Sequence, residues 1–167
     1  MVKQFAQPRL TVELVPTSCW HSNLKKQLPQ SDWDRLRRPV FAAAMHRCEI
    51  CGGHGDRWPV ECHERWEYDD ERCIQRLVGF IALCPSCHLV KHIGRARAHC
   101  EGQVAEAHLS TVNGWTLQKT SRYIELCMSL WRVRNRHDWQ QDFSYLEPLG
   151  VTLSQKPSEH RSSNSVA

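Results

Sequence analysis

Two Cys-x-x-Cys pairs place the strongest constraint on how this chain can fold. The first pair is Cys48 and Cys51, and the second is Cys84 and Cys87. Zinc accepts thiolate sulfur in tetrahedral geometry, and two residues between ligands let one tight turn supply two of them. Four such cysteines form a closed ligand set, which is typical of structural rather than catalytic zinc. The long interval between the pairs leaves room for further structure inside the loop that the metal would close.

A pair of histidines follows the second cysteine pair directly. His88 and His92 lie four residues apart. If residues 87–93 begin a helix, both imidazoles project from one face and can share one divalent ion. Gly94 is a suitable stop for that helix. Histidines also serve as surface or capping residues, but this spacing directly after a cysteine turn favours metal binding.

His63 is the third histidine of interest and lies between the cysteine pairs. A strand over residues 58–68 would place Glu61 and His63 on one face, and Cys62 and Glu64 on the other. This alternation favours His63 acting with Glu61 or lying in a hairpin bend. It leaves open whether Cys62 or His63 completes the ligands of the ion, and whether His63 or Glu64 takes part in proton transfer.

Composition narrows the class of protein. The chain has 167 residues, 41% of them hydrophobic, which suits one compact domain, and a formal net charge of +4. Residues 1–10 lack the apolar core of a signal peptide, and no stretch approaches a membrane span, so we expect a cytoplasmic protein. The odd number of cysteines favours reduced thiols and metal over disulfides. The basic residues after the histidines suit contact with phosphate: Lys91, Arg95 and Arg97.

Alternating apolar residues predict strands on both sides of this centre. Residues 10–16 and residues 76–83 both show such a pattern, and the second segment would complete a hairpin with residues 58–68. Residues 139–149 predict a closing strand that could pair with residues 10–16.

Helical patterns occupy most of the remaining chain. Ser31 is expected to cap a helix that Pro39 kinks or restarts. Residues 103–112 and 116–136 predict two further helices. The Ser-rich residues 154–167 predict a disordered tail.

Residues 48–96 resemble the HNH endonuclease family, whose fold is a β-hairpin followed by a metal-bearing helix, the ββα-metal finger. Zinc-clipped members open this helix with Cys-x-x-Cys-His-x-x-x-His, which residues 84–92 match at every position. The first catalytic element of the family is a metal ligand followed by a general-base histidine. Here its candidates are Cys62–His63 and His63–Glu64. The family's bracing Asn, five residues before the third cysteine, is replaced by Gly79. The longer frame also resembles small bacterial HNH proteins.

The expected fold is therefore one α+β domain over residues 1–153. It would comprise an HNH finger core over residues 48–96 with a four-cysteine zinc clip, flanking α-helices and a small terminal β-sheet. The resemblance implies metal-dependent hydrolysis of phosphodiester bonds, with DNA as partner. It also implies a catalytic divalent ion such as Mg²⁺, Mn²⁺, Ni²⁺ or Zn²⁺ besides the structural Zn²⁺. The expected catalytic residues are His63, Glu64, His88 and His92.

Each expected role follows from side-chain chemistry. His63, neutral at pH 7, would take a proton from the attacking water. An ion on His88 and His92, with Cys62 or His63 as a possible third ligand, would polarise the phosphate.

Two other interpretations stay open. A catalytically impaired finger of the same fold would bind nucleic acid or protein, and Gly79 in place of Asn is its best support. A zinc-stapled structural protein would carry the histidines incidentally. A thioredoxin-like redox role is weaker, because no βαβ pattern accompanies the cysteine pairs.

Overall fold

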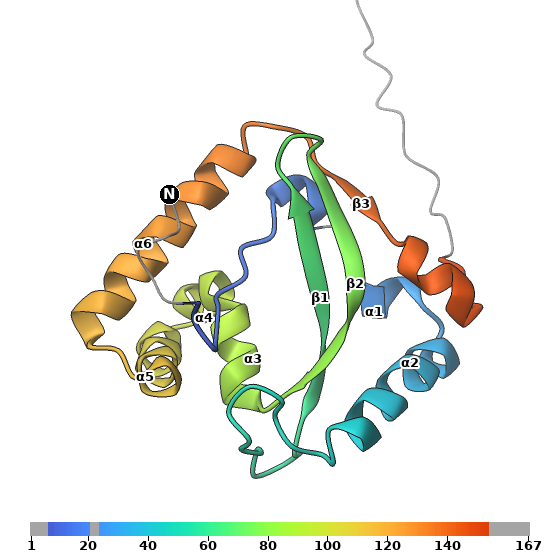
Figure 1. Cartoon of the computed structure of the whole chain (residues 1–167), viewed down its shortest axis with the longest axis horizontal. Helices are drawn as coiled ribbons and strands as arrows, with labels where there is room; N and C mark the ends of the chain where they lie inside the picture. The colour runs from blue at the N-terminus through green and yellow to red at the C-terminus, as the bar shows by residue number, and fades with distance from the viewer. Residues whose placement is uncertain (1–6, 21–23, 154–167) are drawn as a thin grey trace, which may run out of the picture.

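The structure is a computed structural model that describes residues 7–20 and 24–153. A long antiparallel hairpin runs through the middle of the molecule, formed by β1 (Glu61–Asp69) and β2 (Ile74–Leu83) (Figure 1). A bulge between Arg65 and Trp66 shifts the register of the hairpin. A short strand, β3 (Gln140–Asp142), adds to β2 in parallel, so the order in the sheet is β1-β2-β3.

Four helices lie on one side of the hairpin, as Figure 1 shows. They are α3 (Pro85–Lys91), α4 (Ile93–Ala98), α5 (Gly102–Asn113) and α6 (Leu117–Arg134). Their buried faces meet in a first core that also contains three of the paired cysteines. This core comprises Leu10, Cys48, Leu83, Cys84, Cys87, Val90, Ile93, Ala96, Ala105, Leu109, Tyr123 and Ile124.

The opposite side of the hairpin carries a second core. It is covered by α1 (Leu24–Gln27), α2 (Gln30–Ala43) and the 3-10 helix η2 (Ser144–Leu149). A further 3-10 turn, η1 (Thr17–Cys19), precedes α1. The architecture is thus mixed α+β, with a small sheet between two groups of helices. The buried residues of the second core are Leu24, Leu28, Trp33, Leu36, Leu77, Leu146 and Val151.

The predicted terminal sheet is wrong. Residues 10–16 form an extended N-terminal arm outside the three-stranded sheet, with a backbone bond from Glu13 N to Lys91 O at 3.0 Å. The arm alternates because Leu10, Val12 and Leu14 contact the first core, while Glu13 reaches His63 on β1. The strand predicted over residues 139–149 is confined to β3, which pairs with β2 instead of with the arm.

The predicted N-cap of α2 is also wrong. Pro29, not Ser31, precedes its first turn, and the Pro29 carbonyl accepts hydrogen bonds from Asp32 N and Trp33 N. The helix also continues through Pro39 instead of restarting there. Pro39 removes one backbone donor, and the buried residues of α2, Trp33 and Leu36, both precede it.

The remaining helices follow their patterns more closely. The predicted helix after the second cysteine pair is α3, but Gly94 does not stop it, because α3 ends at Lys91 and Gly94 lies inside α4. Gly114 adopts the left-handed conformation after α5, and Thr116 caps α6. Among the described residues, no helix is long and apolar enough to cross a membrane. The tail predicted over residues 154–167 lies outside the described residues.

Candidate metal centres

The four paired cysteines converge in the structure. One sulfur from each of Cys48, Cys51, Cys84 and Cys87 lies within 4.8 Å of the other three. The first two come from the loop between α2 and β1, and the other two from the start of α3. Three of the four side chains are buried. The sulfurs therefore approach one another from two segments, as the sequence predicts.

Backbone geometry holds these sulfurs in place. Cys84 is the N-cap of α3, and its Sγ accepts a hydrogen bond from Cys87 N at 3.4 Å. Cys51 Sγ accepts the corresponding bond from Gly53 N at 3.4 Å. Gly52, between these two residues, has a φ of 77°, which favours glycine. Each pair thus forms a tight turn whose backbone N–H groups point at sulfur, an arrangement that stabilises thiolates.

The electrostatics of this cluster favour a bound cation. Burial is the main cause that raises the pKa of Cys84 to about 11, and the charge of Cys48 adds to it. The pKa of Cys87 is also raised, first by its hydrogen bond with Cys48 and then by burial. Four thiolates this close repel one another, and a divalent ion between them removes that repulsion. The donor set is that of a structural zinc site, and it could hold a metal such as zinc.

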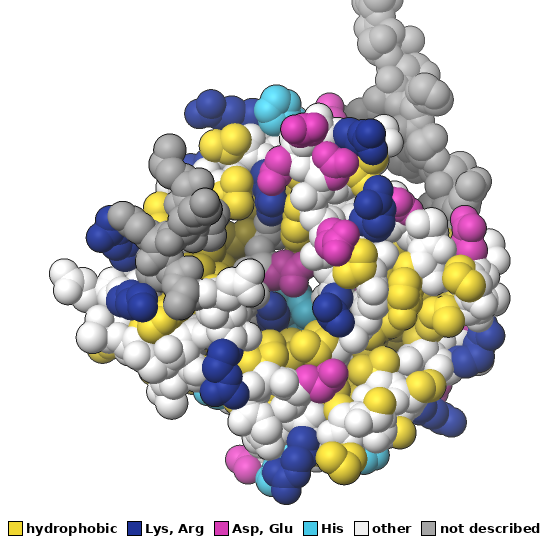
Figure 2. Space-filling model, viewed as in Figure 1, with side chains coloured by type: hydrophobic (Ala, Val, Ile, Leu, Met, Phe, Trp, Pro, Cys, Tyr) yellow, Lys and Arg dark blue, Asp and Glu magenta, His cyan; other side chains and the backbone are white. Residues whose placement is uncertain are grey.

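A second cluster is formed by three histidines. One ring nitrogen from each of His63, His88 and His92 lies within 4.8 Å of the other two. His63 is on β1, His88 is on α3, and His92 joins α3 to α4. The ring centroids are 4.7 to 5.2 Å apart. Figure 2 shows a hollow between α3 and β1, with histidine, acidic and basic side chains at its bottom.

In two of these rings, one imidazole nitrogen contacts a carboxylate. His63 Nε2 lies 3.0 Å from Glu13 Oε2, and His88 Nδ1 is bonded to Glu61 Oε2. The bond to His88 is the main cause that lowers the pKa of Glu61 to about 2. A histidine that ligates metal commonly donates its second N–H to a carboxylate, which fixes the tautomer and the ring orientation. Both rings have this arrangement here.

Two observations test whether the histidine cluster fits an ion. His63 is 3% exposed, and its Nδ1 is buried with no hydrogen-bond partner among the described residues. Burial, followed by the neighbouring charges of His88 and His63, lowers the pKa of His92 to about 3. His92 is therefore neutral at pH 7 and keeps a lone pair, as a metal ligand must. The residues present thus fit a divalent ion that takes imidazole nitrogen.

Cys62 and Glu64 lie outside this cluster. Cys62 packs against the second core, and burial raises its pKa to about 12. Of the two candidates for third ligand, the structure places His63, not Cys62, beside His88 and His92. Burial also raises the pKa of Glu64. The carboxylates that contact the imidazoles directly are those of Glu13 and Glu61.

The three basic residues expected to contact phosphate differ in their surroundings. Lys91 Nζ donates to Thr11 Oγ1 at 2.7 Å, and burial lowers its pKa. Arg97 forms an ion pair with Glu106 at 2.7 Å. Arg95 is exposed, and its charge contributes to the lowered pKa of His92. Arg95 is therefore the member of this group best placed to meet an anion at the histidine cluster.

Sequence reasoning missed two residues that touch the candidate centres. Glu13 is 50 positions from His63, and His108 of α5 places Nε2 3.2 Å from Cys87 Sγ. The one available signal for Glu13 is an acid inside the otherwise apolar alternation of residues 10–16. The helical pattern places His108 on one face of α5 but gives no indication that it meets the cysteines.

Comparison of the chain with protein-family models, curated proteins and solved structures finds no match.

Proposed function

We propose that this protein is a metal-dependent phosphodiester hydrolase of the HNH type that acts on DNA. The observation that carries the proposal is the histidine cluster, in which His63 of β1 meets His88 and His92 at the end of α3. A hairpin followed by a helix, both supplying ligands, is the arrangement that the sequence resemblance implies. The adjacent cysteine cluster has the donor set of a site that would only hold the scaffold.

The proposed ligands of the catalytic ion are His63, His88 and His92. Three protein ligands leave a coordination position for water or substrate, which is the pattern of catalytic rather than structural sites. A divalent ion there would supply Lewis-acid polarisation of the phosphate and activation of water. Glu13 and Glu61 would orient the imidazoles, and Arg95 would offset phosphate charge.

His63 has a second possible role, that of general base. Its Nδ1 is unpartnered among the described residues, and a free imidazole nitrogen can take a proton as readily as it can bind metal. We assign the ligand role because His63 is buried and lies as close to each of the other two rings as a shared ion requires.

A plasmid-nicking assay tests the proposal. The purified protein is incubated with supercoiled DNA and Mg²⁺, Mn²⁺, Ni²⁺ or Zn²⁺ in turn, and nicking is expected with at least one ion. His88→Ala should lower the rate by about 10²-fold or more, with partial rescue at high metal concentration. His137→Ala is the matched control, because His137 is exposed and outside both clusters. Wild-type protein that nicks DNA with none of these ions contradicts the proposal.

The same metal titration separates the two roles of His63. If His63 is a ligand, His63→Ala should be rescued by excess metal to the same extent as His88→Ala. If His63 is the base, its loss should resist rescue at any metal concentration. Glu64→Gln is expected to change the rate little, because Glu64 lies outside the histidine cluster.

One observation favours a binding module as the second candidate. Gly79, at the position of the family's Asn, has a φ of 153°, and a Cβ there would lie 3.8 Å from Tyr145 Oη on η2. A side chain at this position would thus meet η2, and the family's bracing Asn is absent. Retention of DNA in a gel-shift assay without cleavage under any metal would favour this candidate.

A further inference from the structure

A chain of hydrogen bonds leads from the far strand of the sheet to His63. Gln141 Nε2 of β3 donates to Gln75 Oε1 at 2.8 Å, and Gln75 Nε2 donates to Tyr68 Oη at 3.1 Å. Tyr68 Oη donates to Glu13 Oε1 at 3.3 Å, and the other oxygen of Glu13 faces His63 Nε2 at 3.0 Å. Five side chains from the arm and all three strands are joined in this way.

The direction of these bonds has a chemical consequence. Each donor points toward Glu13, so the carboxylate accepts from Tyr68 on one oxygen and from His63 on the other. A carboxylate has no proton to donate at neutral pH, and His63 must therefore carry its proton on Nε2. That tautomer leaves the lone pair on the buried Nδ1, the atom without a partner among the described residues.

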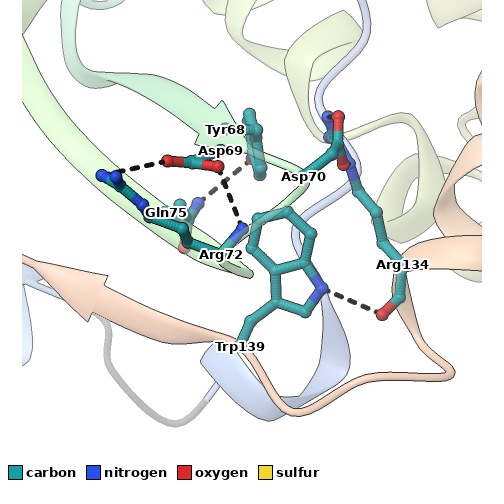
Figure 3. A network of polar contacts seen from close by, with 7 residues as sticks. All are labelled: Tyr68, Asp69, Asp70, Arg72, Gln75, Arg134 and Trp139. Atoms are coloured by element: carbon teal, nitrogen blue, oxygen red, sulfur yellow. Dashed lines mark hydrogen bonds and ion pairs between the residues drawn. The ribbon is translucent and has the colours of Figure 1, made fainter.

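The chain is partly buried and braced by aromatic contacts. Gln75 is 0% exposed. The ring of Tyr68 packs edge-on against Trp139 at 5.8 Å, and the Arg134 guanidinium lies over it at 4.1 Å. Figure 3 shows Tyr68 and Gln75 on the hairpin, with Arg134 and Trp139 beside them. Buried donors and acceptors in such a network have few alternative partners, so each bond fixes the next.

We propose that Tyr68, Gln75 and Gln141 are positioning residues, which hold Glu13 against His63 and thereby aim Nδ1 at His88 and His92. The inference rests on the metal-site part of the proposed function and not on DNA cleavage. It assigns a role in metal binding to residues that do not touch the ion. Glu13 is the link through which they act.

The test measures Co²⁺ binding to protein whose cysteine cluster is already loaded with zinc. Visible absorption reports Co²⁺ on nitrogen ligands, and absence of sulfur-to-cobalt bands confirms that the cysteines stay on zinc. Tyr68→Phe removes only the hydroxyl and keeps the ring between Trp139 and Arg134. We expect about 10-fold weaker Co²⁺ binding, within the range for outer-shell partners, together with a modest fall in melting temperature, because Gln75 Nε2 loses its acceptor. Tyr145→Phe is the matched control, because the ring of Tyr145 also packs against an aromatic neighbour, Phe80.

Two further measurements distinguish positioning from a general structural effect. Glu13→Gln should weaken Co²⁺ binding by about 10- to 100-fold. The double variant with Tyr68→Phe should bind no more weakly than Glu13→Gln alone, because Tyr68 acts through Glu13. In the metal-free protein, nitrogen-detected NMR of the imidazole should show His63 protonated at Nε2 in the wild type and a mixture of tautomers in Tyr68→Phe.

Each outcome decides the inference. The inference would be overturned if wild type and Tyr68→Phe bound Co²⁺ equally, or if Tyr145→Phe lost as much Co²⁺ affinity as Tyr68→Phe. Full additivity of the two losses in the double variant would also overturn it. So would a wild-type histidine cluster that binds no Co²⁺. Intact Co²⁺ binding that depends on Tyr68, together with no DNA cleavage, would leave the inference standing while the proposed nuclease function fails.

Discussion

Cys84 combines three structural roles in one side chain. It follows the last residue of β2, its Sγ caps α3, and the same sulfur belongs to the cysteine cluster. Capping needs only an acceptor of about this size, whereas zinc binding needs a thiolate. A substitution that keeps the cap and removes the thiolate therefore isolates the contribution of the metal.

Cys84→Ser is that substitution, because a serine hydroxyl is a good N-cap. We expect loss of bound zinc and a fall in melting temperature of about 10 °C or more, since zinc-binding free energy is folding free energy in such sites. Metal analysis and thermal unfolding check both outcomes. Cys100→Ser, at an exposed cysteine outside the cluster, should leave both values unchanged. A Cys84→Ser protein that retains one tightly bound zinc would contradict the assignment of the cluster.

His108 acts on the same centre from outside it. Its Nε2 lies 3.2 Å from Cys87 Sγ, and an N–H donated to a thiolate offsets part of the negative charge of four sulfurs. We expect His108→Ala to weaken zinc binding by about 10-fold, measured by competition with a coloured chelator. His108→Asn, which keeps a donor, should weaken zinc binding less. His99→Ala is the control on the segment after α4, and equal losses in all three variants would argue against a specific contact.

At the scale of elements, the sequence was most informative where contacts are local. The Cys-x-x-Cys-His-x-x-x-His pattern predicted a helix after the second cysteine pair, and α3 carries His88 and ends one residue before His92. The alternation of residues 76–83 predicted β2. Both predictions depend only on the order of neighbouring side chains.

Long-range contacts set the limit of such reasoning. The N-terminal arm alternates like a strand, yet its apolar residues pack on helices and its Glu13 meets His63 of β1. The local sequence pattern is the same for an extended segment that packs through its side chains and for a strand that pairs through its backbone. The position of His63 rather than Cys62 beside the other histidines also depended on which face of β1 meets α3, and only the packed structure fixes that face.

Arg134 ties the hairpin tip to the end of α6. Its guanidinium makes a two-pronged ion pair with Asp70 at 2.7 and 3.0 Å and lies over the rings of Tyr68 and Trp139 (Figure 3). Lysine would keep the positive charge, but it has neither the two parallel N–H donors nor the planar group that stacks on the aromatic rings. We expect Arg134→Lys to lower stability by about 1–2 kcal/mol, allowing for the exposure of Asp70, which corresponds to about 2–8 °C in thermal unfolding. Arg132→Lys, at an exposed neighbour on the same helix, should have no measurable effect.

At the scale of the whole molecule, β2 is shared between the two cores. Leu83 belongs to the first core, with Cys48, Cys84 and Cys87, whereas Leu77 belongs to the second. The cysteine cluster is thus part of the packing of α3 to α6, while the histidine cluster is formed by β1, α3 and the junction of α3 with α4. Loss of metal from the two clusters should therefore have different consequences for the fold.

Stepwise metal removal tests this difference. Protein loaded with both ions should contain two metals per chain. A mild carboxylate chelator should remove the ion from the histidine cluster first, leaving one metal and an unchanged circular dichroism spectrum, because His88 and His92 are only partly buried. A thiol-modifying reagent should then release the second metal together with helical signal, since three of its ligands lie in the first core. Unfolding should be cooperative, because β2 carries residues of both cores. One metal per chain at saturation, or loss of helical signal with the first metal released, would contradict the separation of a structural from a functional centre.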